Sequence, residues 1–276
     1  MISRDSSTTT AIVVGVDPDA NPWGAVRWAA TEAADRGLRL RLVHLVDTVR
    51  AADDLADFPS GQAAFHAGGR FLESAQAHAA FVAPGVEVSW ELLRADDTVA
   101  IGQVAADAYF VVTGTADAEP RPDVFGATGY ALFRHGRCVV VAVPGLPHLD
   151  RRTSSPIALV FAGAHGTATT ENMIGFAFEE ADVRGAPILA VSTGPDPGRA
   201  EIFQRWRAKF PDLPVLSRSV KDAAHLLDAI GDAQLVVIGC HDGEGNDGFD
   251  SQSFVRRAAG AIDAPFAVVR SCSDLT

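Results

Sequence analysis

The chain has few cysteines and no long apolar run. Its 276 residues include three cysteines, Cys138, Cys240 and Cys272, which are far apart and form no C-x-x-C pair. This pattern predicts neither a disulfide framework nor a cysteine metal site, and it fits a reducing compartment. No apolar run approaches the roughly 18 to 20 residues of a membrane-spanning helix. The polar first ten residues also lack the apolar core of a signal peptide. We therefore expect a cytoplasmic protein with no membrane partner.

Basic residues are also fewer than acidic ones. Lys and Arg number 23 against 35 Asp and Glu, which gives a formal net charge of −12. Nucleic acids and anionic membranes are bound through basic surfaces. The charge balance therefore argues against both as general partners.

Recognisable catalytic motifs are missing as well. The sequence contains no G-x-x-x-x-G-K-[ST] and no H-E-x-x-H. Cys240, His241 and Asp242 are consecutive, so their side chains cannot converge on one reacting atom as a nucleophile, a base and an orienting group must. His44 in a buried strand and His135 near a helix end are interpreted as structural histidines. We expect no enzyme activity.

What the sequence does contain is a repeat. Ala11-Ile-Val-Val-Gly-Val-Asp17 opens a strand, turn and helix that end at Gly37, before the strand 38–46. Roughly 145 residues later, Pro156-Ile-Ala-Leu-Val-Phe-Ala162 opens the same order, with Gly185 in the place of Gly37. Internal duplication predicts two domains of one fold, 1–147 and 148–276, joined by a polar linker.

Each half alternates short Val/Ile/Leu runs with helical periodicity, which is typical of strands buried on both faces and joined by helices. In the first half, the expected strands are 12–16, 40–46, 86–92, 108–113 and 139–143, and the expected helices are 21–36, 65–82, 96–106 and 126–135. In the second half, the strands are 157–161, 188–192, 215–220, 234–239 and 266–270, and the helices are 169–184, 199–210, 221–230 and 251–262. The predicted fold class is α/β, with two tandem open five-stranded, mainly parallel sheets flanked by helices.

Four stretches resemble a universal stress protein domain: Ile12-Val-Val-Gly-Val-Asp17, Ala25-Val-Arg-Trp-Ala-Ala30, Leu40-Arg-Leu-Val-His-Leu45 and His135-Gly-Arg-Cys-Val-Val-Val141. The second half has the same pattern of elements, but fewer of its residues match the family. The resemblance implies an adenine nucleotide alpha hydrolase-like fold in each half. It also implies pairing through the last strands, so that 139–143 and 267–270 are neighbours in an intramolecular pseudo-dimer.

Some members of that family bind ATP or AMP at the carboxyl ends of the strands, through an aspartate that closes the first strand and a loop of the form G-x-x-G, nine residues, G-[ST]. Asp17, Gly114 and Gly126 match parts of this pattern, and Thr115 and Thr128 could donate hydrogen bonds to phosphate. Glycines let the backbone approach phosphate, and a helix N-terminus adds partial positive charge. These five residues are the candidate binding residues for ATP or AMP with Mg²⁺.

The first half also departs from the pattern. Asp117 stands where the second glycine belongs, the gap is one residue short, Ala127 replaces the hydroxyl residue, and Pro18 follows the aspartate. Asp117 and Glu119 place negative charge where a triphosphate would lie, whereas Arg121 could partly compensate by donating to phosphate. An alternative interpretation is therefore open, in which Asp17 caps the helix that starts near Asn21 and the glycines serve turn and helix-start geometry.

The second half has lost more of the pattern. Ala162 stands in the place of the aspartate, and the loop 239–250 carries four carboxylates with no Lys or Arg. This loop contains a G-x-G-x-x-G, but it follows the fourth strand of its repeat and is acidic, so we do not interpret it as a dinucleotide fingerprint. Its oxygen ligands do not have the EF-hand spacing. We expect an acidic solvated loop and no metal site.

The sequence thus predicts a non-enzymatic tandem universal stress protein with a partly degenerate crevice in the first half and a lost one in the second. The alternative is a nucleotide-independent adaptor that acts through protein partners.

Overall fold

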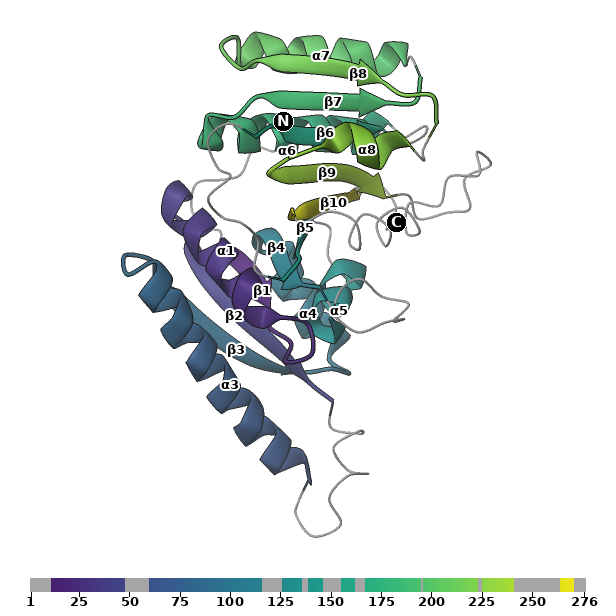
Figure 1. Cartoon of the computed structure of the whole chain (residues 1–276). Helices are drawn as coiled ribbons and strands as arrows, with labels where there is room; N and C mark the ends of the chain where they lie inside the picture. Colours follow the sequence, from purple (N-terminus) through teal and green to yellow (C-terminus); the bar gives the residue numbers. More distant parts are fainter. Residues whose placement is uncertain are drawn as a thin grey trace. The chain divides into compact units, whose positions relative to one another are not determined.

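The computed structural model describes residues 11–47, 60–115, 126–135, 139–145, 155–161, 167–194, 196–222, 225–240 and 264–270. By their internal contacts, the residues form two compact units, Met1–Cys138 and Val139–Thr276. Each unit is a parallel-rich sheet with packed helices, so the predicted α/β class is confirmed (Figure 1).

The described part of the first unit alternates strands and helices: β1 (Ala11–Gly15), α1 (Pro22–Arg36), β2 (Arg39–Val46), α3 (Ser60–Val82), β3 (Val88–Arg94), α4 (Thr98–Ala106), β4 (Ala108–Gly114) and α5 (Ala127–His135). The strand order is β3-β2-β1-β4, and all neighbours are parallel. Helices α1 and α3 lie side by side, and α4 packs on α5 (Figure 1). Successive side chains of β4 point to opposite faces of the sheet. Phe110 contacts Trp28 of α1 on one face, whereas Thr113 lies against Gly129 of α5 on the other.

The described part of the second unit contains β5 (Val140–Val143), β6 (Ile157–Phe161), α6 (Thr167–Arg184), β7 (Ile188–Ser192), α7 (Pro197–Lys209), β8 (Val215–Ser219), α8 (Leu226–Ile230), β9 (Leu235–Cys240) and β10 (Phe266–Arg270). Its order is β5-β10-β9-β6-β7-β8. All pairs are parallel except β5 with β10, where Ala267 is opposite Val141. The pairing that the resemblance implied between 139–143 and 267–270 is therefore present, and the structure shows it to be antiparallel. Through this pairing, β5 belongs to the second compact unit although it ends the first sequence repeat.

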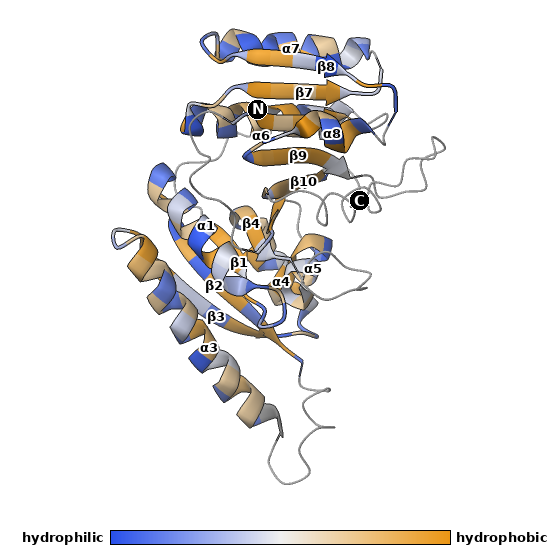
Figure 2. Cartoon of the chain, in the orientation of Figure 1, coloured by the Kyte–Doolittle hydropathy of each residue, from blue (hydrophilic) through white to orange (hydrophobic). Residues whose placement is uncertain are grey.

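Both cores combine buried strands with the buried faces of the helices packed on them. Every residue of β5 and β6 is buried, as continuous apolar runs predict for strands covered on both faces. Figure 2 shows hydrophobic residues concentrated on strands such as β7 and β9, whereas α7 alternates hydrophobic and hydrophilic positions. The helix predicted at 221–230 is shorter in the structure, where α8 begins at Leu226 and the backbone bends at Lys221 and Asp222. The helix predicted at 251–262 lies outside the described residues.

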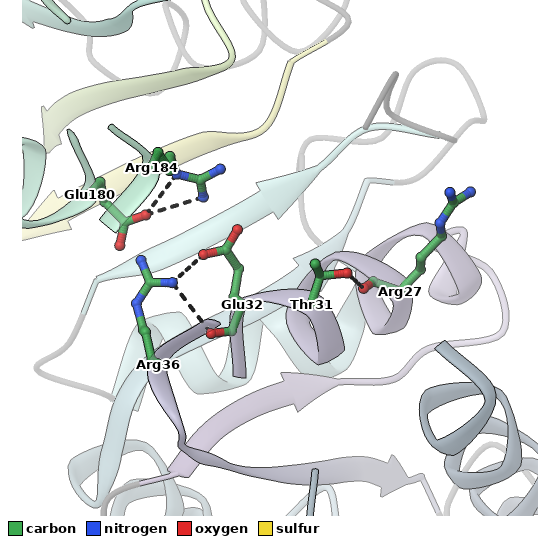
Figure 3. A network of polar contacts seen from close by, with 6 residues as sticks. All are labelled: Arg27, Thr31, Glu32, Arg36, Glu180 and Arg184. Carbon is green, nitrogen blue, oxygen red and sulfur yellow. Dashed lines mark hydrogen bonds and ion pairs between the residues drawn. The ribbon is translucent and has the colours of Figure 1, made fainter. Parts of the chain in front are cut away.

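The first helix of each repeat ends in the same way. Gly37 and Gly185 adopt the left-handed conformation that ends a helix, with φ of 63° and 59°. One residue before each glycine, an arginine pairs with a glutamate one turn earlier: Arg36 with Glu32, and Arg184 with Glu180 (Figure 3). All four side chains are almost fully buried, at 1–6% relative exposure.

Within the part of the chain that the structure describes, no helix is both long enough and apolar enough to cross a membrane.

Candidate functional site

The candidate residues of the first unit meet at the carboxyl ends of two neighbouring strands. β1 and β4 are parallel, with Gly15 paired to Thr113. Asp17 follows β1, Gly114 ends β4, and Thr115 comes next. Because parallel strands end at a common edge of the sheet, residues about 100 positions apart come together there. This edge is where open α/β sheets hold their ligands.

The Asp17 side chain faces the start of α5. It is 9% exposed, and its Oδ1 atom accepts a hydrogen bond from the Asp19 N–H at 3.3 Å. A Cβ atom built on Gly126 would lie 2.8 Å from Asp17 Oδ2 and 3.0 Å from Asp17 Cβ. Asp17 is therefore in contact with the residue that precedes α5. The alternative interpretation, in which Asp17 caps α1, is not what the structure shows, because the N-cap of α1 is Asn21 and the Asp17 carboxylate accepts from the Asp19 N–H instead.

Gly114 is needed for close packing of backbone on backbone. A Cβ atom at this position would lie 1.7 Å from the Ala20 carbonyl oxygen and 2.7 Å from that of Asn21. The connection between β1 and α1 therefore runs directly against the end of β4. A glycine is required here whether or not a ligand binds nearby.

The two candidate threonines are both buried. Thr128 is 1% exposed, and its Oγ1 accepts a hydrogen bond from the Leu45 N–H of β2 at 3.3 Å. Thr115 is 7% exposed. Next to Thr128, a Cβ on Gly129 would lie 2.2 Å from Thr113 Oγ1, so α5 begins in close contact with the sheet. Thr128 thus has a structural bond in the position where the sequence predicted a donor to phosphate.

The remaining predicted features of this edge are outside the described residues. They include Asp117, Glu119 and Arg121 in the loop after β4. His44 behaves as the structural histidine that the sequence predicted, with Nδ1 2.7 Å from the Val16 carbonyl oxygen. Among the described residues, no group of three or more His, Cys, Asp or Glu side chains could hold a metal ion.

At the corresponding edge of the second unit, the structure places a charged residue that the sequence did not single out. The residues expected to mark the lost site, Ala162 and the acidic loop after Cys240, lie outside the described residues. Arg199, in the first turn of α7, extends over the ring of Phe161, the last residue of β6, at 4.6 Å from the ring centroid. The sequence held one signal that could have drawn attention to Arg199. Asp196 and Pro197 mark a helix start, and a cation in the first turn of a helix is unusual because it opposes the helix dipole.

Both described sheets are open and mainly parallel, with helices packed on them and polar residues at the carboxyl edge. This arrangement defines the class of doubly wound α/β proteins.

Comparisons with known proteins identify the family within that class. The model of the universal stress protein family matches residues 8–144. A universal stress protein of Mycolicibacterium smegmatis is 28% identical over 301 residues, which cover 96% of this chain and 98% of the relative. One of Mycobacterium tuberculosis is 26% identical over 318 residues, 97% of each chain. The chain belongs to the universal stress protein family, a family with a stress-response role.

A solved structure shows the same fold over nearly the whole length. A universal stress protein from Archaeoglobus fulgidus superposes with a TM-score of 0.70 at 10% identity, covering 95% of this chain and 98% of that one. At this identity the likeness concerns the fold alone.

Proposed function

We propose that this protein is a non-enzymatic, tandem stress-response protein in which the first crevice is partly degenerate and holds neither ATP nor AMP tightly, while the second crevice has lost the nucleotide site. The two repeats act as one cytoplasmic pseudo-dimer. Neither repeat turns over a substrate.

The contact between Asp17 and Gly126 carries this proposal. The N-terminus of a helix attracts an anion, and a phosphate would use that position at α5. Here the Asp17 carboxylate is the anion in contact with the residue before α5. A nucleotide phosphate would have to approach a carboxylate that is nine-tenths buried, and unscreened like charges disfavour that approach.

Two neighbouring contacts support the same conclusion. The β1–α1 connection packs directly against Gly114, and the hydroxyl of Thr128 accepts a hydrogen bond from the Leu45 N–H. Neither residue is therefore kept solely for a ligand. The Thr128 hydroxyl keeps its own hydrogen to donate, but the bond that it accepts from Leu45 fixes its position against β2.

Native mass spectrometry of freshly purified protein, followed by calorimetric titration with ATP and with AMP in the presence of Mg²⁺, tests the proposal. We expect no retained nucleotide and no saturable heat for the wild type at millimolar ligand. Asp17→Asn removes the charge with little change in shape, and Glu73→Gln, at an exposed position of α3, is the matched control. If Asp17→Asn gains binding while Glu73→Gln does not, a remnant crevice is present.

The other outcomes separate the alternatives. If neither the wild type nor Asp17→Asn binds, the nucleotide-independent adaptor is the better description. Nucleotide retained by the wild type and lost in Asp17→Ala would overturn the proposed function. ATP turnover above the buffer blank would overturn its non-enzymatic part.

A further inference from the structure

Arg199 is held over an aromatic ring at the carboxyl edge of the second sheet. Its guanidinium carbon lies 4.6 Å from the centroid of Phe161, and an Nη2 hydrogen is donated to the Gly194 carbonyl oxygen. Phe161 is 2% exposed, and its ring also meets that of Phe203 edge-on at 6.1 Å. The guanidinium therefore has a fixed position, set by a buried ring and by a backbone carbonyl.

The charge of Arg199 is not neutralised by the described residues. None of their carboxylates lies within ion-pair distance of the guanidinium. Asp196 uses its Oδ1 atom to accept the backbone N–H of Arg199 at 3.2 Å. Burial lowers the pKa of Arg199, and the nearby charge of Asp196 opposes that effect. A half-buried cation in the first turn of a helix also opposes the helix dipole, so its position costs free energy that an anion would recover.

A hydroxyl lies on the same face of the sheet. Ser192, the last residue of β7, is the register partner of Phe161. Paired residues of parallel strands point to the same face, so the Ser192 side chain lies on the face where Arg199 covers Phe161. Ser192 is half-buried.

We propose that Arg199 and Ser192 form an oxyanion site in the second unit, which binds one phosphate or carboxylate group of a small molecule. A guanidinium has five N–H donors in a planar fork that matches two oxygens of such a group. One Nη2 hydrogen is donated to Gly194, and within the described ranges the other donors have no protein acceptor. A serine hydroxyl adds a neutral donor to the same oxyanion.

This site goes beyond the proposed function and does not depend on it. It uses neither Asp17 nor the start of α5, and its cation comes from α7 rather than from the loop after β9. Binding at Arg199 and binding at the first crevice can therefore fail separately.

The test is calorimetric titration of the full chain, in a buffer free of phosphate and carboxylate, with inorganic phosphate and separately with acetate. Arg199→Gln removes the cation, and Arg207→Gln makes the same change at an exposed position of the same helix. We expect saturable binding of at least one anion by the wild type, a loss of at least about tenfold in affinity in Arg199→Gln, and no change in Arg207→Gln. Phosphate binding alone would identify a phosphate site, and acetate binding a carboxylate site.

The proposal is overturned if neither anion gives saturable heat, or if the two arginine variants lose affinity equally, because the effect would then be one of net charge. If Arg199→Gln does not fold, the wild type still decides the matter by NMR of its arginine side chains. One Nε–Hε resonance that shifts saturably with the anion, and that is missing from Arg199→Lys, supports the site. Uniform small shifts of all of them contradict it.

Discussion

At the carboxyl edges of the two units, the described residues at the end of the first strand of each repeat differ in charge. In the first unit, the residue after β1 is Asp17, a buried carboxylate in contact with Gly126. In the second unit, the last residue of β6 supports the guanidinium of Arg199. A sheet edge is formed by strand ends and loops whose side chains contribute little to the core, so its chemistry can change while the fold remains.

The ends of the first helices show the opposite behaviour. Both repeats keep a left-handed glycine and, just before it, a buried arginine paired with a glutamate one turn earlier. A buried charge whose partner is removed is far more costly than an altered loop. The pairs therefore persist in both halves, whereas the residues at the sheet edges diverge.

The largest expected effect is the loss of one buried ion pair. Glu32→Gln and Glu180→Gln each remove a buried carboxylate that pairs with an almost fully buried arginine, and we expect each to lower the free energy of unfolding by about 3–5 kcal/mol. Urea denaturation followed by tryptophan fluorescence measures this, with Glu201→Gln, at an exposed position of α7, as the control. A loss below about 1 kcal/mol, typical of surface pairs, would contradict it. Unequal losses would show that the two helix ends are not equivalent.

The next effect concerns the close approach at Gly114. Gly114→Ala places a methyl group 1.7 Å from the Ala20 carbonyl oxygen, and a backbone atom cannot rotate away, so we expect destabilisation by about 2–3 kcal/mol. Gly69→Ala in α3 meets nothing within 4 Å and should stabilise by about 0.5–1 kcal/mol. Thermal unfolding of the two variants should therefore shift in opposite directions. A neutral Gly114→Ala would mean that the β1–α1 connection is loosely held.

The smallest effect tests the bond between α5 and β2. Thr128→Val keeps the shape but removes the oxygen that accepts from Leu45, and a buried N–H without a partner should cost about 1–2 kcal/mol. Thr31→Val removes an exposed hydroxyl that bonds to Arg27 within α1 and should change stability by less than about 0.5 kcal/mol. If both variants behave alike in urea, the Thr128 bond contributes nothing to the stability of the edge.

Periodicity and turn residues predicted much of the fold. Three strands of the second half, 157–161, 188–192 and 266–270, have the predicted bounds, because continuous apolar runs are recognised without knowledge of their neighbours. Gly37 is the predicted C-cap of α1. The prediction failed at the helix expected over 221–230. In the structure, α8 begins only at Leu226, and the backbone bends at Lys221 and Asp222.

For the site, the sequence placed Asp17, Gly114 and Gly126 correctly in one region but could not say what they touch. The contact of Gly114 with Ala20 depends on two connections that approach across the sheet edge. The bond from Leu45 to Thr128 joins residues 83 positions apart. Neither has a local signature, because both arise from packing between segments that are distant in sequence.

The sequence by itself determined the repeat, the order of strands and helices, the apolar cores and the family, since these depend on local periodicity and on residues that recur in register. Only the tertiary structure decided that the carboxylate of Asp17 lies against Gly126, that Thr128 bonds to β2, and that Arg199 covers the end of β6. The physical reason is that the chemistry of a parallel sheet's edge is set by which connections meet there, and that depends on the crossover path of the whole chain.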